Sequence, residues 1–263
     1  MLDTLKKIRP LSLVIVVVMT CGCSYATKMA TAERQYQQSV SQKVLILMDL
    51  DTLFADQPLR QLAAAAGKGR ISTIDKLIEQ GVDVNAQGTR KATALFWSMR
   101  SEKGFNHLLA KGANPNVVFG DGGSVMHWLA RKSDCRMLKT ALAHGGNPNL
   151  RAGLFGGSPA FETITVGKNK GVPTCLELLL ANGADIEFKD DKGSTLLFVA
   201  ADLARFDIAL YLLDEGANPK VIGARNRSLR SVHDSFYDAF NEGSVTEQNW
   251  FKFKQRLDEI GIN

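Results

Sequence analysis

The sequence lacks the motifs that identify common classes of enzyme. It contains no Gly-x-Ser-x-Gly sequence of a hydrolase and no phosphate-binding loop ending in Gly-Lys-Thr. Its few histidines are scattered without the spacing of metal ligands: they are His107, His127, His144 and His233. We therefore expect no catalysis, no cofactor and no bound metal.

Positive charge is too scarce to indicate nucleic-acid binding. The formal net charge is +5, and removal of residues 1–22 takes away three basic groups and one acidic group, which leaves about +3. The chain also lacks the long apolar run of a membrane-spanning helix near its N-terminus. The largely apolar residues 11–19 fall well short of the ~20 residues that a bilayer requires.

The N-terminus instead has the layout of a secretory signal peptide. Lys6, Lys7 and Arg9 precede the apolar run, and small residues and two cysteines follow it. We assign residues 1–22 to this signal. The protein is therefore expected to be exported.

The stretch 18–24 resembles a bacterial lipobox, in which an acylated cysteine becomes the first residue of the mature protein. The resemblance implies Cys23 as the lipidated residue, because Gly22 precedes it, with Cys21 as the alternative acceptor. Ser24 implies sorting to the outer membrane, facing the periplasm, with the lipid as the only membrane contact. The alternative is a soluble periplasmic protein released by simple cleavage.

A five-residue pattern recurs at intervals of 31, 33, 38 and 33 residues. The five copies are Gly81-Val-Asp-Val-Asn85, Gly112-Ala-Asn-Pro-Asn116, Gly145-Gly-Asn-Pro-Asn149, Gly183-Ala-Asp-Ile-Glu187 and Gly216-Ala-Asn-Pro-Lys220. Each glycine follows an apolar stretch of helical character, where a left-handed residue commonly ends a helix. The Asp or Asn two residues later favours a turn. The pattern therefore predicts helix ends and not a metal site.

A second pattern lies in register with the first and begins at Thr93, Ser124, Ser158 and Thr195, with Pro58 and Leu59 leading into the first copy. Together the two patterns resemble the ankyrin-repeat family, whose first helix opens with Thr-Pro-Leu-His-x-Ala. The resemblance covers about residues 57–220. It implies an all-α solenoid of about five helix-turn-helix repeats joined by short hairpin loops.

This fold divides the chain into four parts. We expect a lipoprotein signal peptide at 1–22, a lipidated tether and N-terminal cap at 23–56, the ankyrin repeats at 57–220 and a helical C-terminal cap at 221–263. Apolar spacing predicts cap helices at 228–240 and 246–260, the second capped by Thr246.

The fourth repeat is long, and its insertion falls near residues 167–173, between the two helices. It is either a specificity element or a tolerated surface loop. Cys135 and Cys175 lie near the starts of second helices in neighbouring repeats. Equivalent helix positions lie on the order of 10 Å apart, whereas a disulfide needs Cα atoms within ~7 Å. We therefore expect two buried free thiols.

Residues 44–54 contain Asp49 and Asp51, and they look like the first motif of haloacid-dehalogenase-type phosphatases. That family places a Gly between the second Asp and the Thr, and this sequence has none there. We expect the segment to pack on the first repeat, with both carboxylates on a solvated helix or turn.

In the ankyrin family the partner-binding concave face consists of hairpin tips and the exposed side of each first helix. The resemblance implies these contacts: Arg90, Trp97, Arg100, Phe119, Asp121, Trp128, Arg131, Arg151, Phe155 and Asp190. Trp and Arg are enriched in interface hot spots. Trp97 and Trp128 could equally serve packing between repeats. Phe119 and Phe155 are expected to be exposed, because hairpin tips have little core to join.

More loosely, the chain resembles periplasmic ankyrin lipoproteins that accompany phospholipase toxins of the type VI secretion machinery and protect the producing cell. The resemblance implies an immunity protein that binds and inhibits such a toxin. The alternative is a periplasmic scaffold or stabiliser of an envelope enzyme.

Overall fold

The computed structural model describes residues 48–153, 155–165 and 171–262. The predicted signal peptide, Cys21, Cys23 and the tether lie outside the described residues. Contacts between Cα atoms divide the chain at Leu47, and the unit that begins at Met48 is described by itself.

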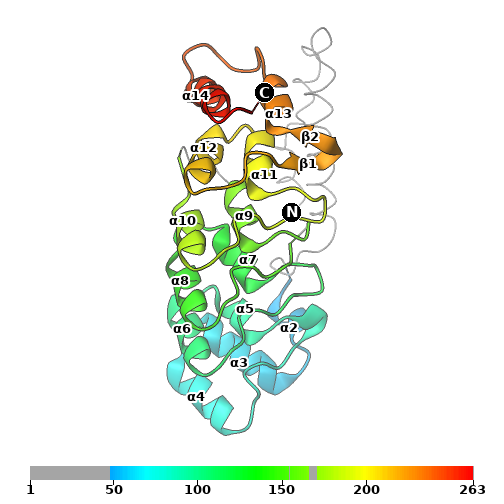
Figure 1. The fold of residues 1–263 in the computed structure, drawn as a ribbon. Coiled ribbons are helices and arrows are strands. Elements are labelled where there is room, and N and C mark those ends of the chain that lie inside the picture. Colours follow the sequence, from blue (N-terminus) through cyan, green and yellow to red (C-terminus); the bar gives the residue numbers. More distant parts are fainter. Residues whose placement is uncertain (1–47, 154, 166–170, 263) are drawn as a thin grey trace, which may run out of the picture. The chain divides into compact units, whose positions relative to one another are not determined.

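Five helix pairs follow one another along this unit, each pair stacked on the next (Figure 1). The pairs are α3 (Gln57–Gly67) with α4 (Ile71–Glu79), α5 (Ala94–Ser98) with α6 (Glu102–Ala110), α7 (Val125–Ala130) with α8 (Arg136–Ala143), α9 (Pro159–Thr165) with α10 (Thr174–Ala181), and α11 (Leu196–Asp202) with α12 (Phe206–Asp214). The short α2 (Leu50–Leu53) packs on α3, and it brings Leu53 and Phe54 into the core. The predicted succession of paired helices is confirmed.

The first helix of most pairs begins at a hydroxyl side chain, as the second sequence pattern predicts. Thr93, Ser124 and Thr195 each accept a hydrogen bond from the backbone N–H three residues later. This contact satisfies an amide that would otherwise lack a partner at the helix start. Asp56 does the same for α3.

The glycines of the five-residue pattern end the second helices in the left-handed conformation that was predicted. Gly112, for example, has φ 87°, and a Cβ added to it would meet nothing within 4 Å. The conformation and not a lack of space therefore favours glycine at this position.

The last residue of the same pattern joins each repeat to the next, which the sequence did not predict. Asn116 Nδ2 donates to the carbonyl of Gly145 at 2.8 Å, and its Oδ1 accepts from the Asn147 N–H at 2.7 Å. Asn85 and Asn149 make the same two bonds. We call Asn85, Asn116, Asn149 and Glu187 the turn row.

Glu187 forms only part of this link. Its Oε1 accepts from the Asn218 N–H at 2.6 Å, but an ionised carboxylate has no proton to donate to a carbonyl group. The turn row therefore changes its chemistry after the fourth helix pair.

A disulfide joins Cys135 to Cys175, so the prediction of two free thiols was wrong. Their Cα atoms lie 5.4 Å apart. Cys135 is the residue before α8, whereas Cys175 is the second residue of α10. Because the two cysteines do not occupy equivalent helix positions, the separation expected for equivalent positions does not apply.

The insertion of the fourth repeat falls between α9 and α10, as predicted, although residues 166–170 lie outside the described ones. Its final part is fastened to the next repeat. Arg205 Nη2 donates to the carbonyl of Gly171 at 2.8 Å, and the Gly171 N–H donates to Asp207 Oδ2 at 2.9 Å.

The C-terminal segment differs in detail from the prediction. Before its helices it forms a small hairpin from β1 (Ile222–Gly223), η3 (Ala224–Asn226) and β2 (Arg227–Ser228). The helix predicted to reach residue 240 is α13 (Leu229–Asp234), which stops early, and Asp238 has φ 58°, a conformation that a helix cannot contain. The last helix, α14 (Val245–Glu259), is capped by Ser244 and not by Thr246.

Candidate protein-interaction surface

Five short hairpins precede α5, α7, α9, α11 and α13, and the first four are hydrogen-bonded to their neighbours through their backbones. They span residues 87–93, 118–124, 152–157, 189–195 and 222–228. The Gly120 N–H donates to the carbonyl of Arg90 at 2.7 Å, and the Asp191 N–H donates to that of Phe155 at 2.8 Å. A Cβ on Gly120 would lie 3.1 Å from Arg90 Cα, so the backbones approach closely. We call these hairpins the hairpin row, and the hairpin row with α5, α7, α9 and α11 the hairpin face.

Trp97 on α5 combines packing with exposure. Its ring meets Phe54 edge-on, with centroids 6.3 Å apart, and it covers Gly67, where an added Cβ would lie 2.7 Å from the indole Cδ1. Arg100 is exposed and stacks on the same ring at 3.7 Å. Both interpretations of this tryptophan therefore apply, because one part of the ring packs between repeats and another supports an exposed guanidinium group.

Trp128 on α7 occupies the equivalent position, four residues after its helix cap, and it is half-buried. The guanidinium carbon of Arg131 lies 5.3 Å from its ring centroid, and Arg131 Nε lies 3.4 Å from Glu162 Oε2 on α9. Burial raises the pKa of Glu162, and the charge of Arg131 opposes that effect. The aromatic and cationic pairing therefore recurs on two successive first helices.

Phe119 and Asp190 are not exposed contacts. Phe119 is 3% exposed, and its ring lies 5.0 Å from that of Phe96. The expectation that hairpin apolar groups lack a core to join was wrong here, because Phe119 packs against α5 of the preceding helix pair. Asp190 is buried and accepts hydrogen bonds from the N–H groups of Lys192 and Ser194 at 2.9 and 2.8 Å, so it shapes its own turn.

Arg151 lies immediately before the third hairpin, and its charge is paired within the protein. It lies 3.0 Å from Asp191, donates to the carbonyl groups of Gly156 and Lys189, and lies over Phe188 at 4.6 Å. About half of its side chain is still exposed.

The remaining predicted contacts also lie in the hairpin row. Phe155 is half-buried, and Lys192 Nζ lies 4.0 Å from its ring centroid. Asp121 accepts a hydrogen bond from Gly123 N–H at 3.0 Å, and Arg90 is exposed. Sequence reasoning did not single out Lys192, although its hairpin was expected at the surface.

His127 is a structural residue, as the resemblance implied. Its Nδ1 lies 2.7 Å from Ser124 Oγ, and Nε2 donates to the carbonyl of Gly157 in the next hairpin at 3.2 Å. Because a carbonyl only accepts, the proton of the neutral ring lies on Nε2. Burial lowers the pKa of His127 to about 4.

Asp49 and Asp51 lie in a helical segment and not at the end of a strand. Asp49 caps α2 by accepting from the Thr52 N–H at 2.7 Å, and this bond lowers the pKa of Asp49. Both aspartates are exposed, as expected. Among the described residues no cluster of three or more His, Cys, Asp or Glu could hold a metal, and no helix is long and apolar enough to span a bilayer.

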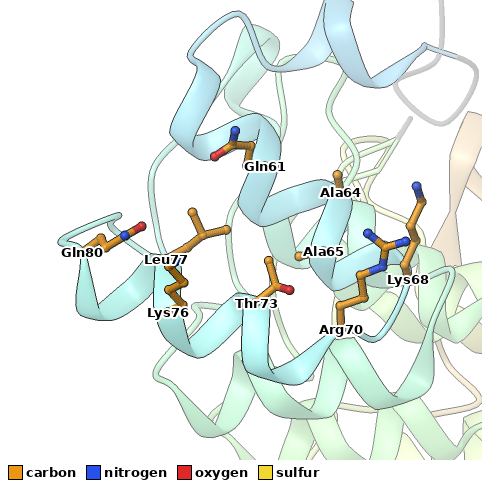
Figure 2. Close-up of a pocket in the computed structure, with 9 residues that line it drawn as sticks. All are labelled: Gln61, Ala64, Ala65, Lys68, Arg70, Thr73, Lys76, Leu77 and Gln80. Carbon is orange, nitrogen blue, oxygen red and sulfur yellow. The ribbon is translucent and has the colours of Figure 1, made fainter.

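A cavity of about 400 Å³ opens between α3 and α4 (Figure 2). Lys68, Arg70 and Lys76 supply its charged groups, and Ala65 and Leu77 supply part of its apolar lining. None of the ten predicted contacts lines this cavity. It is therefore separate from the hairpin face.

Comparison with known proteins shows what this arrangement resembles. Residues 126–222 match the family model described as ankyrin repeats, in three copies. The chain is 32% identical to protein PhlB of Serratia liquefaciens over 146 residues, which cover 55% of this chain and 62% of PhlB. It is 26% identical to phosphocholine transferase AnkX of Legionella pneumophila, over 71% of this chain and 20% of AnkX.

A human relative, SH3 and multiple ankyrin repeat domains protein 1, is 31% identical over 48% of this chain and 6% of its own length. The chain therefore spans less than two thirds of each of these relatives. The similarity supports the repeats themselves.

Proposed function

Since this chain carries ankyrin repeats, which imply protein–protein interaction, we propose that it binds a partner protein through the hairpin face and performs no catalysis itself. The repeated pairing of a half-buried tryptophan with an arginine, at Trp97 and Trp128, is the observation that carries this proposal. Such side chains bury a large area on binding while keeping a polar group available.

The partner that we propose is a phospholipase toxin of a type VI secretion system, which makes this chain a periplasm-facing immunity protein held at the outer membrane through lipid on Cys23. The Cys135–Cys175 disulfide supports an exported location, because disulfides persist in oxidising compartments and are rare in the cytosol. A rigid stack of helices that covers an active-site entrance inhibits without chemistry of its own.

The test is capture of the partner from the cell envelope by the chain carrying a C-terminal tag. The phospholipase activity of the captured protein is then measured on phospholipid vesicles as more of the chain is added. We expect the activity to fall to background at about one equivalent. A captured enzyme that stays active or becomes more stable would make this protein a scaffold, and capture without any phospholipase would reject the immunity role.

Two variants locate the binding surface. Trp97→Ala removes an aromatic group of the hairpin face, whereas Tyr237→Ala removes one that is 73% exposed after α13. We expect the first to weaken capture at least about tenfold, as hot-spot residues do, and the second to leave it unchanged. Thermal unfolding of both variants verifies that Trp97→Ala remains folded.

A further inference from the structure

Cations on the two sides of the helix stack have different partners. On the side of the second helices, three of them pair with carboxylates, and others, such as Lys103 and Lys139, are exposed. Lys111 Nζ lies 2.7 Å from Asp75, Arg136 lies 3.0 Å from Glu102, and Arg205 lies 3.0 Å from Asp207. These positive charges are already compensated within the protein.

On the hairpin face, two cations rest on aromatic rings without a carboxylate. Arg100 lies 3.7 Å over Trp97, and Lys192 lies 4.0 Å over Phe155. Within the described part of the chain, neither forms an ion pair. Burial lowers the pKa of Arg100, because its guanidinium has lost part of its hydration.

The aromatic rings also fix the orientation of these charged groups. A guanidinium stacked on an indole keeps its N–H groups at the edge of the plane, where they can bind a carboxylate with two parallel hydrogen bonds. Arg131 and Arg151 lie over rings as well, but each already faces a carboxylate, Glu162 or Asp191. Arg100 and Lys192 are therefore the positions where a negatively charged group of a partner gains the most binding free energy.

We propose that the partner presents an acidic segment, rich in Asp and Glu, that lies along the hairpin face and pairs with Arg100 and Lys192. This inference rests on the proposed protein-binding function and adds the chemistry of the partner. Arg100 follows α5 and Lys192 precedes α11, three helix pairs further on. At a packing distance of ~10 Å per pair the span is about 30 Å, which an extended segment of about nine residues covers.

The test uses the full chain in detergent solution and a fluorescein-labelled peptide of about 16 residues that alternates Glu and Ser, which is long enough for this span. Fluorescence anisotropy gives its Kd at low and at physiological salt. Matched peptides replace every Glu with Gln or with Lys, and a single-stranded DNA of equal charge serves as a polyanion that is not a protein.

We expect the Glu peptide to bind, the Gln and Lys peptides not to bind, and the double variant Arg100→Glu/Lys192→Glu to weaken binding at least about tenfold. The control is Lys103→Glu/Lys139→Glu, which makes the same change in net charge at two exposed lysines of α6 and α8. We expect it to change the Kd less than about twofold. Should the first variant unfold, Arg100→Gln/Lys192→Gln replaces it and should weaken binding in the same direction.

Three results would overturn the inference: no binding of the Glu peptide, equal loss in both double variants, or tighter binding of the DNA than of the Glu peptide. Each is distinguishable from failure of the proposed function. Capture and inhibition of a phospholipase without peptide binding would keep the immunity role and reject an acidic segment. Peptide binding without any captured phospholipase would keep the acidic segment and reject the immunity role.

Discussion

The turn row and the hairpin row both join successive repeats, but they do so with different chemistry. The turn row uses side-chain amides at three of its four positions, as at Asn116, so its links depend on the residue at each position. The hairpin row uses backbone groups, as between Gly120 and Arg90, so most of its side chains are free to differ. A contact made by the backbone leaves the side chains available for binding, which explains why the proposed binding surface lies there.

The largest effect that we expect concerns a link independent of both rows, the Cys135–Cys175 disulfide. Its 40-residue separation predicts that Cys135→Ser/Cys175→Ser lowers the free energy of unfolding by about 4 kcal/mol in the chain-entropy model. Urea unfolding of the wild type with and without reductant, beside the double variant, measures this change. Equal stability of the oxidised and the reduced wild-type protein would contradict a stabilising role of this disulfide.

His127 on α7 is an exception among the links to the hairpin row, because it is a side chain that reaches the next hairpin. Its pKa is about 4 in the folded protein and about 6.5 when unfolded, so the unfolded state binds more protons between these values. Stability is therefore complete above pH 6.5 and declines by about 3 kcal/mol as the pH falls to 4. Glu162, with its raised pKa, acts in the opposite direction.

Comparison with His127→Gln isolates the histidine, since the substitution leaves Glu162 in place and keeps a side-chain N–H for the carbonyl of Gly157. The difference in unfolding free energy between the two proteins should narrow as the pH falls from 6.5 to 4. A difference that stays constant over this range would show that His127 does not titrate as its burial implies.

A substitution in the turn row should have a smaller effect. Asn116→Ala removes two hydrogen bonds between neighbouring repeats and should cost about 2 kcal/mol of unfolding free energy. Asn182→Ala is the control, because Asn182 bonds only to the carbonyl of Leu178 within its own helix. Denaturant unfolding of both variants tests the distinction. Equal losses of unfolding free energy would show that the turn row stabilises the protein no more than a side-chain bond within one helix.

The smallest effect should be at Arg100. Arg100→Ala removes a partly exposed stack on Trp97, and we expect a loss below about 1 kcal/mol, measured by thermal unfolding. A much larger loss would mean that this residue serves the fold and not binding, and it would weaken the contrast between the two rows.

The sequence predicted features that depend on nearby residues and missed those that depend on distant ones. Helix starts at Thr93 and Ser124 and the helix end at Gly112 follow from local conformation and capping. The burial of Phe119 against Phe96 and the disulfide depend on how elements far apart in the sequence pack. The candidate surface was predicted only in outline, because a hairpin position does not reveal which way its side chain points.

Glu187 has a consequence for how the protein loses its structure. Repeat stacks hold together through nearest-neighbour coupling, so a weaker junction divides them into separate cooperative units. The junction at Glu187 lacks the donor that Asn149 supplies one junction earlier and Asn116 two junctions earlier. We therefore expect the stack to part first between α10 and α11, and amide protons beyond that boundary to exchange with solvent as a group.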